Sequence, residues 1–426
     1  MSRKKKHLTN AKRQASHLPV TSPAPAPAAT PAPARPHVSA VEHFGLGSFV
    51  LILAVLVSTA MYRTRMLDRL ENFHLDSLFI LQRKHVSDKI AIVWITNRDY
   101  KNLFNAISPL NPRIVSDIIG ATARSGARII AVDLDTSDWT AREHEAAASA
   151  SRAGSFPRLV WARTGRFDSD GSFYSDPLQG LASDSCYGVP AVVPDQSRVV
   201  RRYRPFVIDQ RSHLTMPGMP VVLNWLDRHK GGSCMPADLG ESDEDRLIDF
   251  AGGGGDFARL TAEGVLAVAD TAPWRNHNPL AGRIVLIGGA FSQARDVTAT
   301  PVGTAQGVEV MANSVVSASQ GILPIDDDII LAVDLAFGLA VLVVTFYWPG
   351  LWVLWGLTLG FPALLMLVSF ASYTANRYFL SVVPVVVALI LERLLEPRIR
   401  HTRAMAAVHR TFSKAFPLAF RRPSKT

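Results

Sequence analysis

The feature that most constrains this chain is a run of 19 residues without a charged side chain, Phe44–Tyr62. At 1.5 Å per residue, a helix of this length covers about 30 Å, which matches the hydrocarbon core of a bilayer. The small residues Ser58, Thr59 and Ala60 also resemble a signal-peptide cleavage site. A leader of 43 residues is long for a cleaved signal, however, so the run predicts an uncleaved transmembrane helix.

Three further apolar segments lie near the other end of the chain, at Ile329–Trp348, Leu351–Tyr373 and Tyr378–Leu391. With the first run they predict four transmembrane helices, one before a long globular segment and three after it, within residues 329–395. Asp334 and Pro384 are candidates for transmembrane signalling, because a buried acid and a helix kink are often functional in membranes. The alternatives are that Asp334 stays hydrated near the interface and that Pro384 is merely tolerated.

Basic residues crowd both ends of the chain, within a formal net charge of +9. Residues 1–43 also carry a Pro/Ala-rich run, which predicts a disordered tail. Basic segments beside apolar spans are retained in the cytoplasm, so residues 1–43 and 396–426 are predicted to be cytoplasmic tails. Nucleic-acid binding is the weaker account of these charges. Residues 63–328 therefore lie on the other side of the membrane.

The segment 63–328 has the pattern of an α/β domain. Ile90–Ile95, Arg128–Val132 and Arg283–Ile287 are short apolar runs typical of buried strands, and Pro112–Arg124 has the periodicity of a helix. A strand, a helix and a strand in about forty residues predict a right-handed parallel unit. We therefore predict an α/β fold with a mixed or mostly parallel sheet and helices on both faces.

Several residues that follow predicted strands form a candidate ligand site. Gly288 and Gly289 end a strand, where open α/β sheets tend to bind ligands. Asp133, Asp135 and Asp296 also follow strands, and carboxylates gathered at that edge hold cations or cationic solutes. Tight turns for the glycines and turn or capping roles for the acids are the commoner alternatives. No metal site is predicted.

The two cysteines, Cys186 and Cys234, both fall in the segment predicted to lie outside the cytoplasm. They either form a disulfide, as suits an oxidising compartment, or remain as two thiols. The twelve histidines show no pair at metal-ligand spacing, and the sequence has no Gly-x-Ser-x-Gly motif. We therefore expect no enzyme, no catalytic residue and no cofactor.

Four stretches share their order with a known family: LENFHLDSLF at Leu70–Phe79, the strand and proline-rich turn of Ile90–Arg113, GARIIAVDLD at Gly126–Asp135, and LAGRIVLIGG at 280–289, followed by Asp296, Thr300, Pro301 and GVEVMAN at 307–313. In this order, and with the predicted spans around them, they resemble the type-two CHASE domain. The likeness covers roughly residues 63–395. The chain keeps Pro112 and Arg113 but lacks the tryptophan that usually precedes them in the family.

The resemblance implies an extracytoplasmic sensory module of the kind found in bacterial kinases and cyclases. It places the chain in the bacterial inner (plasma) membrane, with the large domain in the periplasm or outside. Family members continue into an output domain, whereas here a basic stretch of about 30 residues follows, so we expect a separate signalling partner. We also expect an unidentified extracytoplasmic ligand, and a homodimer is compatible with this reading. The alternatives are a structural subunit of a cell-envelope assembly and, less favoured, an extracytoplasmic enzyme.

Overall fold

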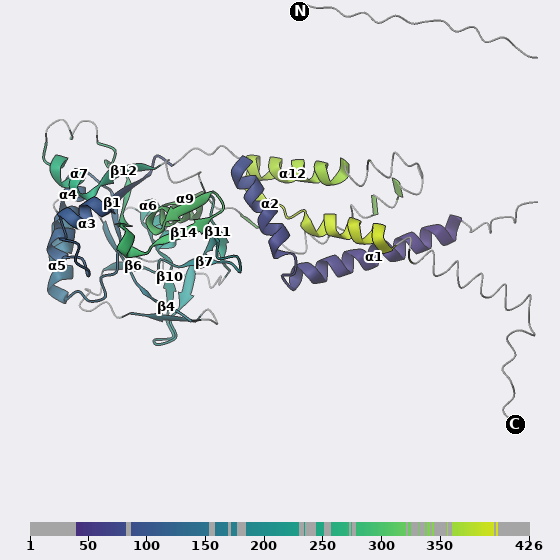
Figure 1. The fold of residues 1–426 in the computed structure, drawn as a ribbon, viewed down its shortest axis with the longest axis horizontal. Helices are drawn as coiled ribbons and strands as arrows, with labels where there is room; N and C mark the ends of the chain where they lie inside the picture. The colour runs from purple at the N-terminus through teal and green to yellow at the C-terminus, as the bar shows by residue number, and fades with distance from the viewer. Residues whose placement is uncertain are drawn as a thin grey trace, which may run out of the picture. The chain divides into compact units, whose positions relative to one another are not determined.

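The computed structural model divides into two compact units, residues 1–46 and 47–426, and the description below concerns the second (Figure 1). The residues that the structure describes are 40–81, 87–152, 158–168, 172–176, 185–229, 234, 244–250, 257–271, 274, 278–320, 323–324, 360–395, 398 and isolated positions within 332–356.

A six-stranded sheet forms the centre of the domain, and every neighbouring pair of its strands is parallel. The prediction of a mostly parallel sheet is thus confirmed. The three strands expected from apolar runs are its three adjacent central members, β1, β13 and β2. In spatial order the strands are β12 (Ala258–Thr261), β1 (Ile90–Thr96), β13 (Ile284–Ala290), β2 (Ile129–Asp133), β3 (Arg158–Ala162) and β6 (Cys186–Gly188).

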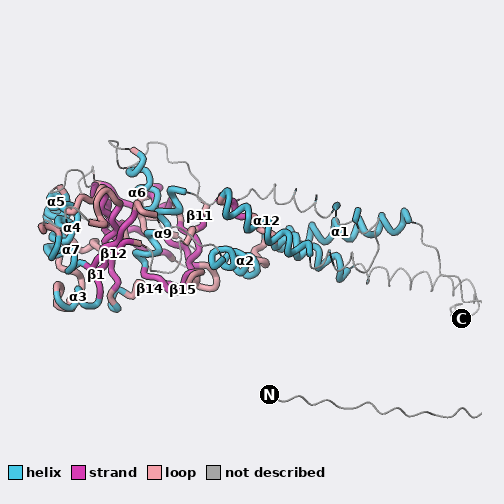
Figure 2. Tube along the Cα trace, turned by 90° about the horizontal axis from the view of Figure 1, so that it is seen from above, coloured by secondary structure: helices cyan, strands magenta, loops and turns pink. Residues whose placement is uncertain are grey.

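Helices cover both faces of this sheet, as predicted (Figures 1 and 2). Side chains alternate between the faces, so Ala91 and Val93 of β1 pack in one layer, whereas Ile90 and Ile92 pack in the other. The first layer contains α4 (Pro112–Arg124), α5 (Ala141–Ser151) and α7 (Ala262–Val268), and the second contains α6 (Met219–Arg228) and α9 (Gly307–Gln320).

A second, smaller sheet lies beside α9. Its three antiparallel strands run in the order β11 (Arg246–Leu247), β8 (Val200–Tyr203) and β7 (Val192–Pro194). Val310 of α9 packs with this sheet, while Val308 and Met311 of the same helix pack with the large sheet. The helix α9 therefore belongs to both cores.

Short strand pairs and connecting helices complete the domain. Their bounds are α3 (Asn97–Asn102), β4 (Gly165–Phe167) with β5 (Phe173–Ser175), β9 (Phe206–Ile208) with β10 (Thr215–Pro217), the 3₁₀ turn Ser292–Ala294, and β14 (Val297–Thr300) with β15 (Gly303–Gln306).

Further helices flank the domain in the sequence: α1 (Ala40–Arg63) and α2 (Asp68–Leu81) before it, and α12 (Phe361–Asn376) and a helix at 383–395 after it. Within the described part of the chain, none of the helices has both the length and the apolar character needed to cross a bilayer. The first predicted span falls inside α1 and the end of the third inside α12. Most of the second span, including Asp334, lies outside the described residues.

The expectation of one continuous helix over Tyr378–Leu391 is wrong. Tyr378 and Phe379 form the strand β17, which pairs in parallel with β16 (Leu323–Pro324), and the helix begins only at residue 383. Pro384 therefore lies in the first turn of that helix, where a missing N–H breaks no helical hydrogen bond. It starts the helix instead of kinking it, and its carbonyl accepts a 2.6 Å hydrogen bond from Ser58 Oγ of α1.

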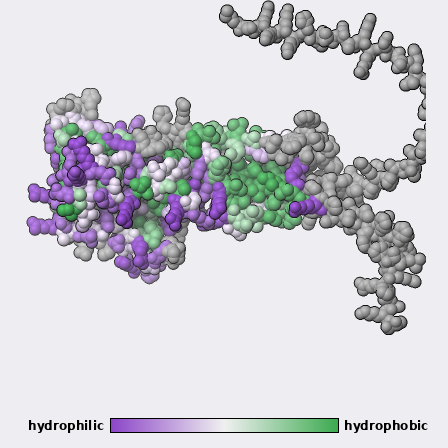
Figure 3. Space-filling view, in the orientation of Figure 1, coloured by the Kyte–Doolittle hydropathy of each residue, from purple (hydrophilic) through white to green (hydrophobic). Residues whose placement is uncertain are grey.

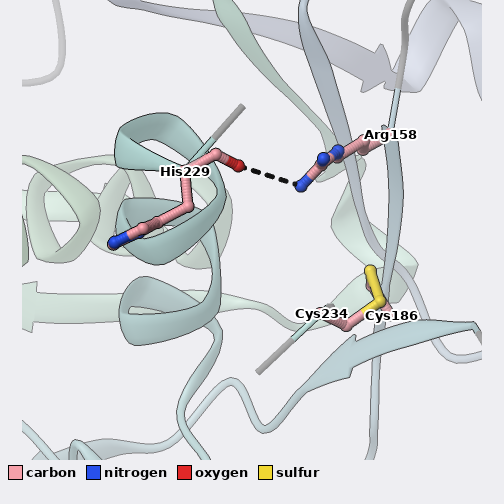
Figure 4. Close-up of a disulfide and its surroundings, with 4 residues drawn as sticks. All are labelled: Arg158, Cys186, His229 and Cys234. Carbon is pink, nitrogen blue, oxygen red and sulfur yellow. Dashed lines mark hydrogen bonds between the residues drawn. A yellow bond between two sulfur atoms is a disulfide. The ribbon is translucent and has the colours of Figure 1, made fainter. Parts of the chain in front are cut away.

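A disulfide joins Cys186 in β6 to Cys234, beyond α6, with the two Cα atoms 5.1 Å apart (Figure 4). It leaves no free cysteine in the chain. Close by, Arg158 of β3 donates a 3.3 Å hydrogen bond to the carbonyl of His229 at the end of α6. The disulfide thus fastens the edge of the sheet to the chain that leaves the helix covering it.

Breaking this disulfide should destabilise the domain. A loop with a sequence separation of 48 is closed by the bond, and opening it should lower the free energy of unfolding by about 2–4 kcal/mol. Thermal unfolding of the full chain in detergent, with and without reductant, measures the effect. The double variant Cys186→Ser/Cys234→Ser serves as the control, because it should melt at the lower temperature in both conditions. Equal melting temperatures for the untreated and the reduced wild type would contradict the prediction.

Candidate functional site

The carboxyl ends of β1, β13 and β2 meet at one edge of the parallel sheet. Gly288 of β13 lies between Trp94 of β1 and Asp133 of β2 in the strand register. The sheet therefore brings the predicted residues Asp133 and Gly288 together, at the edge where ligands commonly bind in α/β folds.

The two predicted glycines serve close packing at this edge. A Cβ atom on Gly288 would lie 2.6 Å from the Cβ of Val308, in the first turn of α9. A Cβ on Gly289 would lie 3.0 Å from the ring of Phe291. Glycine at position 288 thus lets α9 approach the strand, which is the structural alternative to ligand contact.

Asp133 and Asp296 form a pair of acids whose charges interact. Burial and the neighbouring charge of Asp296 raise the pKa of the Asp133 carboxyl to about 7. Burial raises the pKa of Asp296 to about 6. Although Asp296 as a residue is exposed, its carboxylate lies against Gly307, the first residue of α9, where any Cβ would overlap both carboxylate oxygens. The pair can hold a proton near neutral pH, or release it to bind a cationic group.

Asp135 does not join this pair. Its Oδ1 accepts hydrogen bonds from the backbone N–H of Ser137 at 3.0 Å, from the Ser137 hydroxyl at 2.7 Å and from the Thr164 hydroxyl at 3.1 Å. These bonds give it the turn-stabilising role that is common for aspartate after a strand. In the described ranges, no group of three or more side chains is arranged to hold a metal ion.

Sequence reasoning missed three further residues near this edge. The guanidinium of Arg259 in β12 lies 4.6 Å from the centre of the Trp94 ring, and its Nη2 is 3.2 Å from Oε1 of Glu309 in α9. The other oxygen of Glu309 accepts a 3.0 Å bond from the backbone N–H of Gln306. The only local signal was the glutamate within the GVEVMAN motif, and its contact with β12 could not be predicted from the sequence around it.

The acid pair should make stability depend on pH. An acid whose pKa is raised on folding favours the folded state below its unfolded pKa of 3.8, and that contribution is lost as pH rises to about 7. Asp133→Asn cannot ionise, so its melting temperature should increasingly exceed that of the wild type between pH 4 and 7, with a constant difference above. Asp138→Asn, an exposed acid nearby, is the matched control. Parallel curves for Asp133→Asn and the wild type would exclude a raised pKa.

A family model described as the CHASE2 domain matches residues 50–357. Compared with curated proteins and with solved structures, the chain gives no significant match in either set. The matched residues include the six-stranded sheet, the helices on both of its faces and the acid pair. They make up well over half of the chain, and the match confirms the resemblance seen in the sequence. The chain belongs to the CHASE2 family of extracytoplasmic sensory domains.

Proposed function

We propose that this protein is a membrane-anchored sensor of the bacterial inner membrane. Its domain binds a signal outside the cytoplasm and passes it, through the flanking helices, to a separate partner protein. The observation that carries this proposal is that the small sheet and the residue Asp249 beside it are bonded directly to α2, which precedes the domain, and to α12, which follows it. A change in the domain therefore has a direct physical route to both.

The first connection is made by Arg201 of β8, whose side chain is buried. Its Nε and Nη2 donate to the two carboxylate oxygens of Asp76 in α2, at 2.8 and 2.7 Å. Its Nη1 also bonds to Asp195, which accepts a 2.9 Å bond from Asn72 of α2. Bidentate charge-assisted bonds of this kind are strong and fix orientation. α2 therefore cannot turn against β8 without breaking several of them.

The second connection is made by Asp249, two residues after β11. Its buried carboxylate accepts a 2.8 Å bond from the hydroxyl of Tyr373 in α12 and a 2.6 Å bond from Nη1 of Arg377, which follows that helix. Its backbone N–H donates to the hydroxyl of Ser317 in α9 at 2.7 Å. Asp249 thus joins the last turns of α9 and α12.

One helix connects the candidate ligand edge with this contact. α9 begins at Gly307, against the carboxylate of Asp296, and Ser317 lies in its last turns. A ligand that changed the charge or spacing of the acid pair would act on the start of α9. Because Ser317 near the end of α9 bonds to Asp249, a displacement of the helix would also move Asp249. This continuous chain of contacts supports coupling between the acid pair and α12.

Membrane anchorage is supported by apolar side chains on the surface of the flanking helices. Leu56 of α1 is 60% exposed, Leu367 of α12 is 62% exposed and Leu394 is 57% exposed. Hydrophobic residues gather over α1 and α12, whereas the visible face of the α/β domain is mostly hydrophilic (Figure 3). Contiguous apolar surface is stable when lipid or another protein covers it. The disulfide supports an oxidising compartment for the domain.

Copurification of the full chain from mild detergent tests the function. A bound kinase or cyclase is the expected result, whereas an envelope-synthesis complex would indicate a scaffold instead. Turnover of a phosphoester, glycan or peptide would indicate an enzyme. Reporter fusions at residues 20, 200 and 415 should report inside, outside and inside, and an inside signal at residue 200 would contradict the proposed anchorage.

Neutralising Asp249 should loosen α12 from the domain. Asp249→Asn removes the charge that holds Arg377, at a cost of about 1–3 kcal/mol in stability, and hydrogen exchange at the end of α12 should become faster. Asp245→Asn is the matched control. Asp245 pairs with Arg204 at 2.8 Å beside the same small sheet, and this ion pair does not involve α12. Equal exchange in α12 for both variants would mean that Asp249 does not connect the two parts.

A further inference from the structure

The helix α2 changes the direction of the chain directly after α1. Four turn residues, 64–67, separate the two helices, and Arg65 adopts a left-handed backbone conformation with φ of 60°. Figures 1 and 2 agree that α2 runs steeply across the direction of α1. If α1 crosses the bilayer, α2 lies along the plane of the membrane surface.

One face of α2 and of the turn before it is an exposed apolar stripe. The spacing of its members, four, three, seven and one residues, places them on one side of a helix. All of them are more than half exposed: Met66 (68%), Leu70 (52%), Phe73 (71%), Ile80 (69%) and Leu81 (67%). The other side of α2 is already covered, because Leu75, Leu78 and Phe79 are buried in a core with Leu247 of β11 and Tyr373 of α12.

Positive charge is in excess at the start of this stripe, where three arginines stand beside the partly buried acids Asp68 and Glu71. Arg63, Arg65 and Arg69 are all exposed, and they stand at the end of α1, in the turn and in the first turn of α2. Guanidinium groups suit phosphate, which they bind with paired hydrogen bonds. A helix with apolar side chains on one face and arginines beside them is typical of a helix that lies in the lipid interface.

We propose that α2 is an interfacial helix, with its stripe in the outer leaflet and Arg63, Arg65 and Arg69 on lipid phosphates. This inference rests on the proposed anchorage through α1. A second copy of the chain fits the stripe less well, because a parallel pair of α2 helices would bring each Arg69 towards its counterpart beside the same seam. Lipid phosphates oppose this charge instead. Since Asp76 of α2 holds Arg201 of β8, the position of α2 in the lipid is bonded to the domain.

A nitroxide label at position 73 tests the proposal in the full chain. Both native cysteines are in the disulfide, so Phe73→Cys offers one thiol, and the substituted side chain is exposed. Leu56→Cys on α1 and Asp138→Cys on the domain surface are the controls for lipid and water. In vesicles that contain phosphatidylglycerol, labels at 73 and 56 should collide mainly with oxygen, and the label at 138 mainly with a water-soluble nickel chelate.

The outcomes separate this inference from the proposed function. If the label at 73 behaves like the label at 138 while the label at 56 stays in lipid, the interfacial helix is excluded and the anchorage stands. If the labels at 56 and 73 both meet the nickel chelate, the anchorage fails as well. Spin–spin broadening between labels at 73 would show that a second copy covers the stripe, which also overturns the proposal. Replacing Arg63, Arg65 and Arg69 together by glutamine should raise nickel collisions at 73 and leave those at 56 unchanged, and no change at 73 would exclude the phosphate contacts.

Discussion

Strand β13 hydrogen-bonds to both β1 and β2, and these bonds hold the two halves of the parallel sheet together. Its residues from Ile284 to Gly289 are buried on both faces. Without it, β12 and β1 would form one fragment and β2, β3 and β6 another. Because β13 comes late in the sequence, the sheet can close only after most of the domain has been made. The insertion of β13 between β1 and β2 also completes the sheet edge that carries Asp133.

The helix α9 extends this dependence to the rest of the molecule. It follows β13 closely in the chain and packs on Gly288, where only a glycine leaves room for Val308. It also fills the core of the small sheet through Val310 and bonds to Asp249 through Ser317. Such an element, rigid and shared by two cores, is suited to carry a displacement from one end of a domain to the other. This is the physical basis of the proposed sensor function.

The local structure of the large sheet could be predicted because it is encoded locally. Runs such as Ile90–Ile95 and Arg128–Val132 are apolar without interruption, as strands buried on both faces must be. The start of α4 follows from Asn111 and Pro112, which cap and begin that helix. The same reasoning predicted one helix over Tyr378–Leu391, although the run begins with a short strand. A continuous apolar run does not distinguish a strand followed by a helix from a single helix.

The sequence by itself determined the three central strand segments and the mostly parallel class of the sheet, and it predicted the carboxyl edge as the place for a site. Only the tertiary structure decided that β13 lies between β1 and β2, that the charge of Asp296 acts on Asp133 while Asp135 bonds to Ser137, and that Arg201 binds Asp76. It also joined Cys186 to Cys234, a choice that the spacing left open. The reason is physical: periodicity reports which side of an element is buried, whereas the choice of partner depends on packing between segments far apart in the chain.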